Sequence, residues 1–126
     1  MKVTKLDHLV LTVRDIEEAK IFYKTVLGME PVFFGEGRVA LKFGNQKINL
    51  HESGKEFDPK ANHPMPGSSD LCFITSVALE EAMKHVRSCG VKIIEGPVSR
   101  TGATNALLSF YFRDPNGNLI EVSNEV

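Results

Sequence analysis

The sequence predicts an α+β fold of two βαβββ modules, which would form a curved mixed sheet or half-barrel with the helices outside. Two features predict it. Each half reads as strand, helix and three further strands, and each half closes on a Gly-Asn turn before a final strand, at 44–45 and at 117–118. The two amphipathic helices also need a sheet on which to bury their apolar faces. At 126 residues the chain fits a single domain. Within 1–126 we expect module one at about 1–52, a connecting loop at 53–69 and module two at about 70–126.

The first module should begin with a strand and a capped helix. Residues 5–13 alternate as a strand with one buried face does. Asp15 is placed to cap the helix that follows, and Glu18 completes a capping-box spacing. Gly28 is the expected left-handed residue at the helix end. Three strands should then follow, separated by glycine-containing turns, at about 30–34, 37–43 and 46–52.

The second module repeats this order after a long irregular segment. Residues 53–69 are rich in proline and glycine, which is typical of a loop. The Asp-Pro-Asn-Gly sequence at 114–117 is a strong turn signal between the last two strands. The expected elements are a strand at 70–75, a helix at 79–89, a strand at 91–95, a loop at 96–104, and strands at 105–113 and 118–123.

The bulk composition excludes several classes of partner. A net charge of −1 offers no electrostatic attraction to nucleic acid or to an anionic membrane. No apolar stretch is long enough to cross a bilayer and no signal peptide is evident, so the cytoplasm is the expected compartment. Cys72 and Cys89 belong to no CxxC spacing, and we expect two core-facing thiols without a disulfide.

The repeat brings candidate metal ligands to equivalent positions. His8 aligns with Asp70, and Asn49 aligns with Glu121 when one gap is allowed. An imidazole with two carboxylates, from His8, Asp70 and Glu121, suits a divalent first-row metal. The alternative is that His8 is a structural residue at a strand start and Glu121 a solvated edge residue. The symmetry of the placement favours metal ligation.

Three further side chains allow two interpretations each. His51 lies two residues after Asn49 on the same strand face, so it is either a metal ligand or a half-exposed histidine at a strand end. Arg100 lies in the expected glycine-containing loop, where it would either clamp an anionic substrate group or remain solvated. Phe57 would either cover a cavity or pack at a subunit contact.

These segments together resemble the vicinal oxygen chelate superfamily, also called the glyoxalase/bleomycin-resistance/dioxygenase fold. The opening DHLVLTVRD at 7–15 is similar to its first strand, and FYFRDPNGNLIE at 110–121 to its last hairpin. The resemblance covers essentially the whole chain. Within the superfamily the chain looks most similar to the glyoxalase-domain-containing protein 5 group, through residues 49–52, 70–72 and 100–102.

The resemblance implies a homodimer and a divalent metal such as Mn, Mg, Ni, Zn or Fe. By position, His8 and Glu121 match the usual ligands of the family, while Asp70 stands where many members have His. Asn49 stands where glyoxalases have Glu, and Thr12 where they have a glutathione-binding Arg, which argues against lactoylglutathione lyase activity. One histidine with two carboxylates favours Mn²⁺, Mg²⁺ or Ni²⁺ over Fe²⁺.

Two functions of different classes follow from the resemblance. The first is a metal-dependent lyase, isomerase or dioxygenase that chelates adjacent oxygens of a small metabolite. Glu121 would be a ligand and possible base, Asp70 a ligand or base, and Asn49 and Arg100 substrate contacts. The alternative is a drug-sequestering protein without catalysis, like the bleomycin-resistance members, although the lack of Trp argues against an aromatic cavity. A degenerate structural copy is a third reading.

Overall fold

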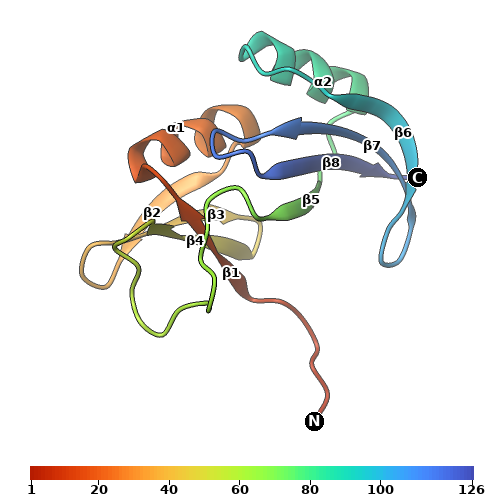
Figure 1. Ribbon diagram of the computed structural model, residues 1–126. Coiled ribbons are helices and arrows are strands. Elements are labelled where there is room, and N and C mark those ends of the chain that lie inside the picture. Colours follow the sequence, from red (N-terminus) through yellow and green to blue (C-terminus); the bar gives the residue numbers. More distant parts are fainter. The chain divides into compact units, whose positions relative to one another are not determined.

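The computed structural model describes residues 1–126 as two compact units, 1–67 and 68–126, and each is described by itself. The first contains β1 (His8–Val13), α1 (Ile16–Leu27), β2 (Glu30–Phe34), β3 (Arg38–Phe43) and β4 (Gln46–Glu52). The second contains β5 (Asp70–Ile74), α2 (Leu79–Ser88), β6 (Glu95–Thr101), β7 (Ala106–Arg113) and β8 (Leu119–Glu125) (Figure 1). The predicted α+β class and the two βαβββ modules are therefore confirmed, and the boundary between the units falls inside the expected connecting segment.

Both units have the same sheet topology. The strand order is β1-β4-β3-β2 in the first and β5-β8-β7-β6 in the second, and neither four-stranded sheet closes into a barrel. The first strand of each unit lies at one edge of its sheet: β1 pairs in parallel with β4, and β5 with β8. All the other strand pairs are antiparallel. The register repeats as well, because Val10 lies opposite Asn49 and Cys72 opposite Glu121.

Helix α1 forms where local signals predict it. The Asp15 side chain accepts a hydrogen bond from the backbone N–H of Glu18 at 3.1 Å, and Gly28 ends the helix with φ 67°. The helix buries Ala19, Tyr23 and Val26 and contacts β2, β3 and β4. This packing leaves the opposite face of the first sheet, which carries residues 49 and 51, free of helix.

Helix α2 contacts β7 in the same way in the second unit (Figure 1). It buries Leu79, Met83 and Val86, and Phe110 and Phe112 of β7 are fully buried. Side chains of a strand alternate between the two faces, so Ser109 and Tyr111 lie on the face away from these phenylalanines. Neither helix is long and apolar enough to span a membrane.

The position of β6 corrects the sequence prediction. The strand covers 95–101, where the sequence predicted a loop, and residues 91–94 are irregular. The Gly96-Pro97 pair reads as loop chemistry, but here it forms a bulge in the pairing of β6 with β7. A Cβ on Gly96 would lie 2.5 Å from the Cβ of Phe110, so glycine lets the two strands approach.

The prediction of two core-facing thiols is wrong for Cys72. Cys72 is exposed on the helix-free face of β5, because the half-buried Leu71 and Phe73 occupy the other face. Cys89 is half-buried at the end of α2, and both cysteines are free thiols.

Candidate functional site

His8 lies at the start of β1 with an oriented ring. Its side chain is 42% exposed, and its Nδ1 lies 2.9 Å from the Asp7 carboxylate. This hydrogen bond is the main cause that lowers the pKa of Asp7 below its ordinary value. A carboxylate on one ring nitrogen fixes the tautomer and leaves Nε2 available to a ligand.

Asn49 and His51 of β4 are buried polar residues with missing partners. They are 9% and 7% exposed, and neither Asn49 Oδ1 nor His51 Nδ1 has a hydrogen-bond partner. The half-exposed alternative for His51 is therefore wrong. The His51 ring lies edge-on to Phe57, with centroids 5.6 Å apart, and Phe57 in turn stacks with Arg38.

Burial is the main cause that lowers the pKa of His51, and the charge of Arg38 adds to it. His51 is thus kept neutral at physiological pH. A neutral imidazole and an amide with free polar atoms, on one face of one strand, can each form a hydrogen bond with a ligand. Phe57 contacts the His51 ring within the first unit, and both alternatives for Phe57, cavity cover or subunit contact, stay predictions.

Glu121 is the centre of the polar face of the second unit. It lies on β8 between Cys72 of β5 and Tyr111 of β7. Its Oε2 atom accepts a hydrogen bond from Ser109 at 2.7 Å, and the Ser123 hydroxyl lies 3.3 Å from the same oxygen. Both serines are fully buried, so the half-buried carboxylate contacts hydroxyl groups on its buried side.

Two weakly acidic groups flank this carboxylate. Burial raises the pKa of the Cys72 thiol, and the carboxylate of Glu121 raises it further, while the contact with the Ser123 hydroxyl at 3.4 Å lowers it. Burial likewise raises the pKa of Tyr111, with Glu121 acting in the same direction. Both groups therefore keep their protons at neutral pH and flank Glu121 in their neutral forms.

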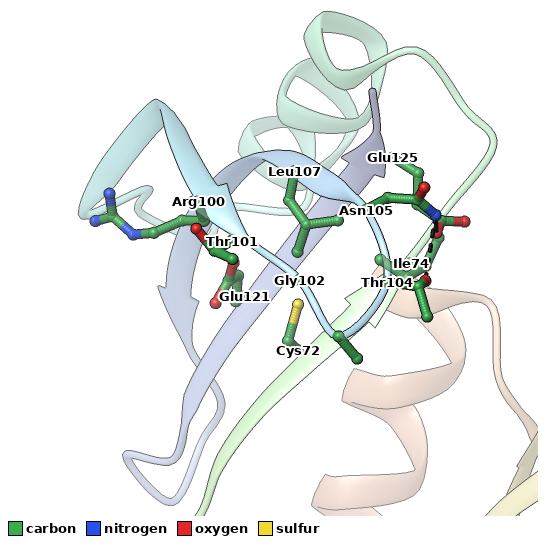
Figure 2. Close-up of a pocket in the computed structure, with 11 residues that line it drawn as sticks. Cys72, Ile74, Arg100, Thr101, Gly102, Thr104, Asn105, Leu107, Glu121 and Glu125 are labelled. Atoms are coloured by element: carbon green, nitrogen blue, oxygen red, sulfur yellow. Dashed lines mark hydrogen bonds between the residues drawn. The ribbon is translucent and has the colours of Figure 1, made fainter.

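Arg100 lies on β6 and not on a flexible loop. Its Nε donates a hydrogen bond to the Tyr111 hydroxyl at 2.8 Å, and its Nη2 lies 3.4 Å from Glu95. In Figure 2 its guanidinium points away from the other labelled side chains. Its role as a free anion clamp is therefore limited, because the charge is already engaged.

A hollow of about 420 Å³ lies in the second unit (Figure 2). Cys72, Ile74 and Leu107 form its apolar lining, and Glu121 and Arg100 lie on its wall. Asp70 is exposed at the start of β5, opposite Leu119, and does not line the hollow. No three His, Cys, Asp or Glu side chains gather closely enough to hold a metal ion. His8, Asn49 and His51 belong to the first unit and Asp70 and Glu121 to the second.

The sequence model of the Glyoxalase/Bleomycin resistance protein/Dioxygenase superfamily matches residues 5–122. The chain belongs to this superfamily. It is 64% identical to an integron cassette protein from the mobile metagenome of V. cholerae, with 98% of this chain and 97% of that chain covered and a TM-score of 0.97.

Two further relatives are each more than half identical in sequence to this chain. A virulence protein of Salmonella typhimurium is 53% identical over 126 residues, which is all of this chain and 88% of that protein, and its crystal structure superposes with a TM-score of 0.98. A glyoxalase domain-containing protein of Mycosarcoma maydis is 54% identical over 123 residues, 98% of this chain and 69% of that protein.

Sequence reasoning missed the hydroxyls around Glu121. Strand alternation alone places Ser123 beside it, two residues on. Ser109 and Tyr111 come from the neighbouring strand, and the β7–β8 register that pairs them with Ser123 and Glu121 is a product of the fold.

Proposed function

We propose that this superfamily domain is a metal-dependent enzyme that acts on a small oxygenated metabolite by bidentate chelation, as a lyase, isomerase or dioxygenase. Family membership supports the class. The observation that carries the proposal is the Glu121 carboxylate, which buried hydroxyls orient beside a hollow of metabolite size. A carboxylate in such a setting is an oxygen donor whose direction is fixed before any ligand arrives.

The donor chemistry fits a divalent metal. His8 has the arrangement expected of a ligating histidine, with Nδ1 held by Asp7 and Nε2 available. We propose His8 and Glu121 as ligands, Asp70 as a third ligand or base, and His51 as a further candidate donor. Without His51, one histidine and two carboxylates favour Mn²⁺, Mg²⁺ or Ni²⁺, with Zn²⁺ and Fe²⁺ as alternatives. A bound ion would supply Lewis-acid polarisation of a substrate oxygen.

The chain's own groups would then orient the substrate and move its proton. Glu121 or Asp70 would accept a proton, since both are carboxylates. Asn49 cannot act as a base, but its free Oδ1 would accept a hydrogen bond from a substrate O–H or N–H. Arg100 would meet a substrate anion only by giving up its contact with Glu95.

A sequestering protein without catalysis is the second candidate. Asn49 favours it, because an amide stands at the position equivalent to Glu121 and no proton can be exchanged there. The apolar lining by Ile74 and Leu107 also suits a bound organic molecule. The two candidates differ in their need for His8 and Glu121.

Elemental analysis by mass spectrometry of untagged protein, prepared without chelator, tests the proposal. We expect about one equivalent of metal per chain in the wild type and a loss of metal in His8→Ala and Glu121→Ala. His63→Ala and Glu36→Ala, at exposed positions in loops, are matched controls that should keep the metal. Full occupancy in both site variants would contradict the ligand assignment. A wild type that stays metal-free after reconstitution would favour the sequestering protein.

The homodimer that the family implies is part of the proposal. Sedimentation velocity at several protein concentrations measures the mass directly. A monomer at all concentrations would contradict it.

A further inference from the structure

We infer that the buried hydroxyl pair Ser109–Ser123 is a positioning element that fixes the Glu121 carboxylate through one oxygen and leaves the other for the ligand. The inference rests on the proposed function, in which Glu121 binds the metal. It assigns a role to two serines that no motif identifies. The relevant contacts are all within the second unit.

The geometry permits one direction for the hydrogen bonds. Ser109 has one hydroxyl proton, and its 2.7 Å contact with Glu121 Oε2 uses it, because a carboxylate only accepts. The 2.7 Å contact between Ser109 and Ser123 must then be donated by Ser123. Ser123 is left to accept from the Cys72 thiol at 3.4 Å.

The result is a chain of donors that runs from Cys72 through Ser123 and Ser109 to Glu121. Each member donates to the next, and successive hydrogen bonds in such a chain strengthen one another. Both serine contacts with the carboxylate are made to Oε2, at 2.7 Å from Ser109 and 3.3 Å from Ser123. The serines therefore leave Oε1 to meet a metal ion or a substrate proton.

The burial of both serines indicates that their hydroxyl groups have a specific role. Ser109 and Ser123 are both fully buried and lie opposite each other in the β7–β8 register. Alanine or valine would fill such strand positions without a polar group to satisfy. Two serines in this place are satisfied only because they bond to each other and to the carboxylate.

Metal affinity in single variants tests the order of the chain. We would measure the Mn²⁺ and Ni²⁺ dissociation constants by isothermal titration calorimetry. Loss of a group that orients a ligand typically weakens binding about 10- to 100-fold, and we expect this for Ser109→Ala. Ser123→Ala should lose less, because Ser109 still donates to Oε2. Ser99→Ala, which removes an exposed hydroxyl on β6, is the control and should bind as the wild type does.

The double variant provides a second check. When Ser109 is absent, Ser123 can donate directly to Oε2 from its present 3.3 Å. Ser109→Ala with Ser123→Ala should therefore bind several-fold more weakly than Ser109→Ala alone. Equal affinities for Ser109→Ala and the wild type, or a loss in Ser99→Ala as large as in Ser109→Ala, would overturn the inference.

A readout without metal separates this inference from the proposed function. Side-chain couplings of Glu121 in the metal-free protein report whether it keeps one rotamer. We expect one rotamer in the wild type and in Ser99→Ala, and averaging in Ser109→Ala with the remaining spectrum unchanged. A wild type that binds no metal overturns the metal proposal alone, and an unaveraged Glu121 in the serine variants overturns the positioning role.

Discussion

Replacing Asn49 by Leu should stabilise the metal-free protein. Asn49 is 9% exposed, and its Oδ1 has no hydrogen-bond partner. Leaving a buried acceptor unsatisfied costs about 1–3 kcal/mol. Leucine has a similar size but a different shape, and we allow about 1 kcal/mol for imperfect packing. The expected net gain is roughly 1 kcal/mol, which for a domain of this length raises Tm by about 3–5 °C.

A matched control exists in the second unit. Asn118 is fully buried, but its Oδ1 accepts from the backbone N–H of Ser69 at 2.9 Å and its Nδ2 donates to Asp114 at 2.7 Å. Asn118→Leu leaves both partners without their hydrogen bonds and should lower the free energy of unfolding by about 3–5 kcal/mol. Urea unfolding of both variants, followed by circular dichroism, measures the two free energies. A loss of more than 1 kcal/mol in Asn49→Leu would refute the reasoning, since the amide would then have a partner.

Three more predictions concern pH, backbone and thiol chemistry. The pKa of His51 is lowered on folding, so protonation favours the unfolded chain, and its stabilising contribution is present above the unfolded pKa and lost as pH falls. His51→Phe should therefore gain stability relative to the wild type between pH 7.5 and pH 5, which urea unfolding at both pH values checks; an unchanged difference would contradict it. Gly96→Ala should cost about 2–4 kcal/mol because its Cβ would meet Phe110, whereas Gly117→Ala, with open space, should cost about 1–2 kcal/mol in thermal unfolding. The pKa of Cys72 is raised, so its reaction with iodoacetamide should be slow at neutral pH and accelerate only in alkaline buffer. The reaction is measured in a Cys89→Ser background, and rapid reaction at pH 7 would contradict the prediction.

Local signals in the sequence were sufficient for the elements that they govern directly. The cap at Asp15 and the left-handed Gly28 act within one helical turn, so their roles could be read without the fold. The sequence repeat gave the equivalence of Asn49 and Glu121, and the register of the two sheets agrees with it. Strand β6 was misplaced because Gly96-Pro97 predicts a loop unless the neighbouring strand is known to need a close approach.

The contacts around the site residues could not be predicted from the sequence, because they join different segments of the chain. His51 contacts the ring of Phe57, which comes from the segment after β4. The engagement of Arg100 depends on Tyr111, eleven residues away on the next strand. Such contacts follow from register and loop path, which residue type and spacing do not encode.

The two modules have kept one topology but diverged in how their equivalent polar residues are satisfied. Ser109 hydrogen-bonds to both Glu121 and Ser123. Their equivalents, Asn49 and His51, are both buried, and each retains a polar atom without a partner. A satisfied carboxylate is already fixed in direction, whereas an unsatisfied buried group gains a hydrogen bond only when a ligand supplies it. Under the proposed function, the second module would hold a preoriented metal ligand, and the first would gain free energy on recognising a substrate.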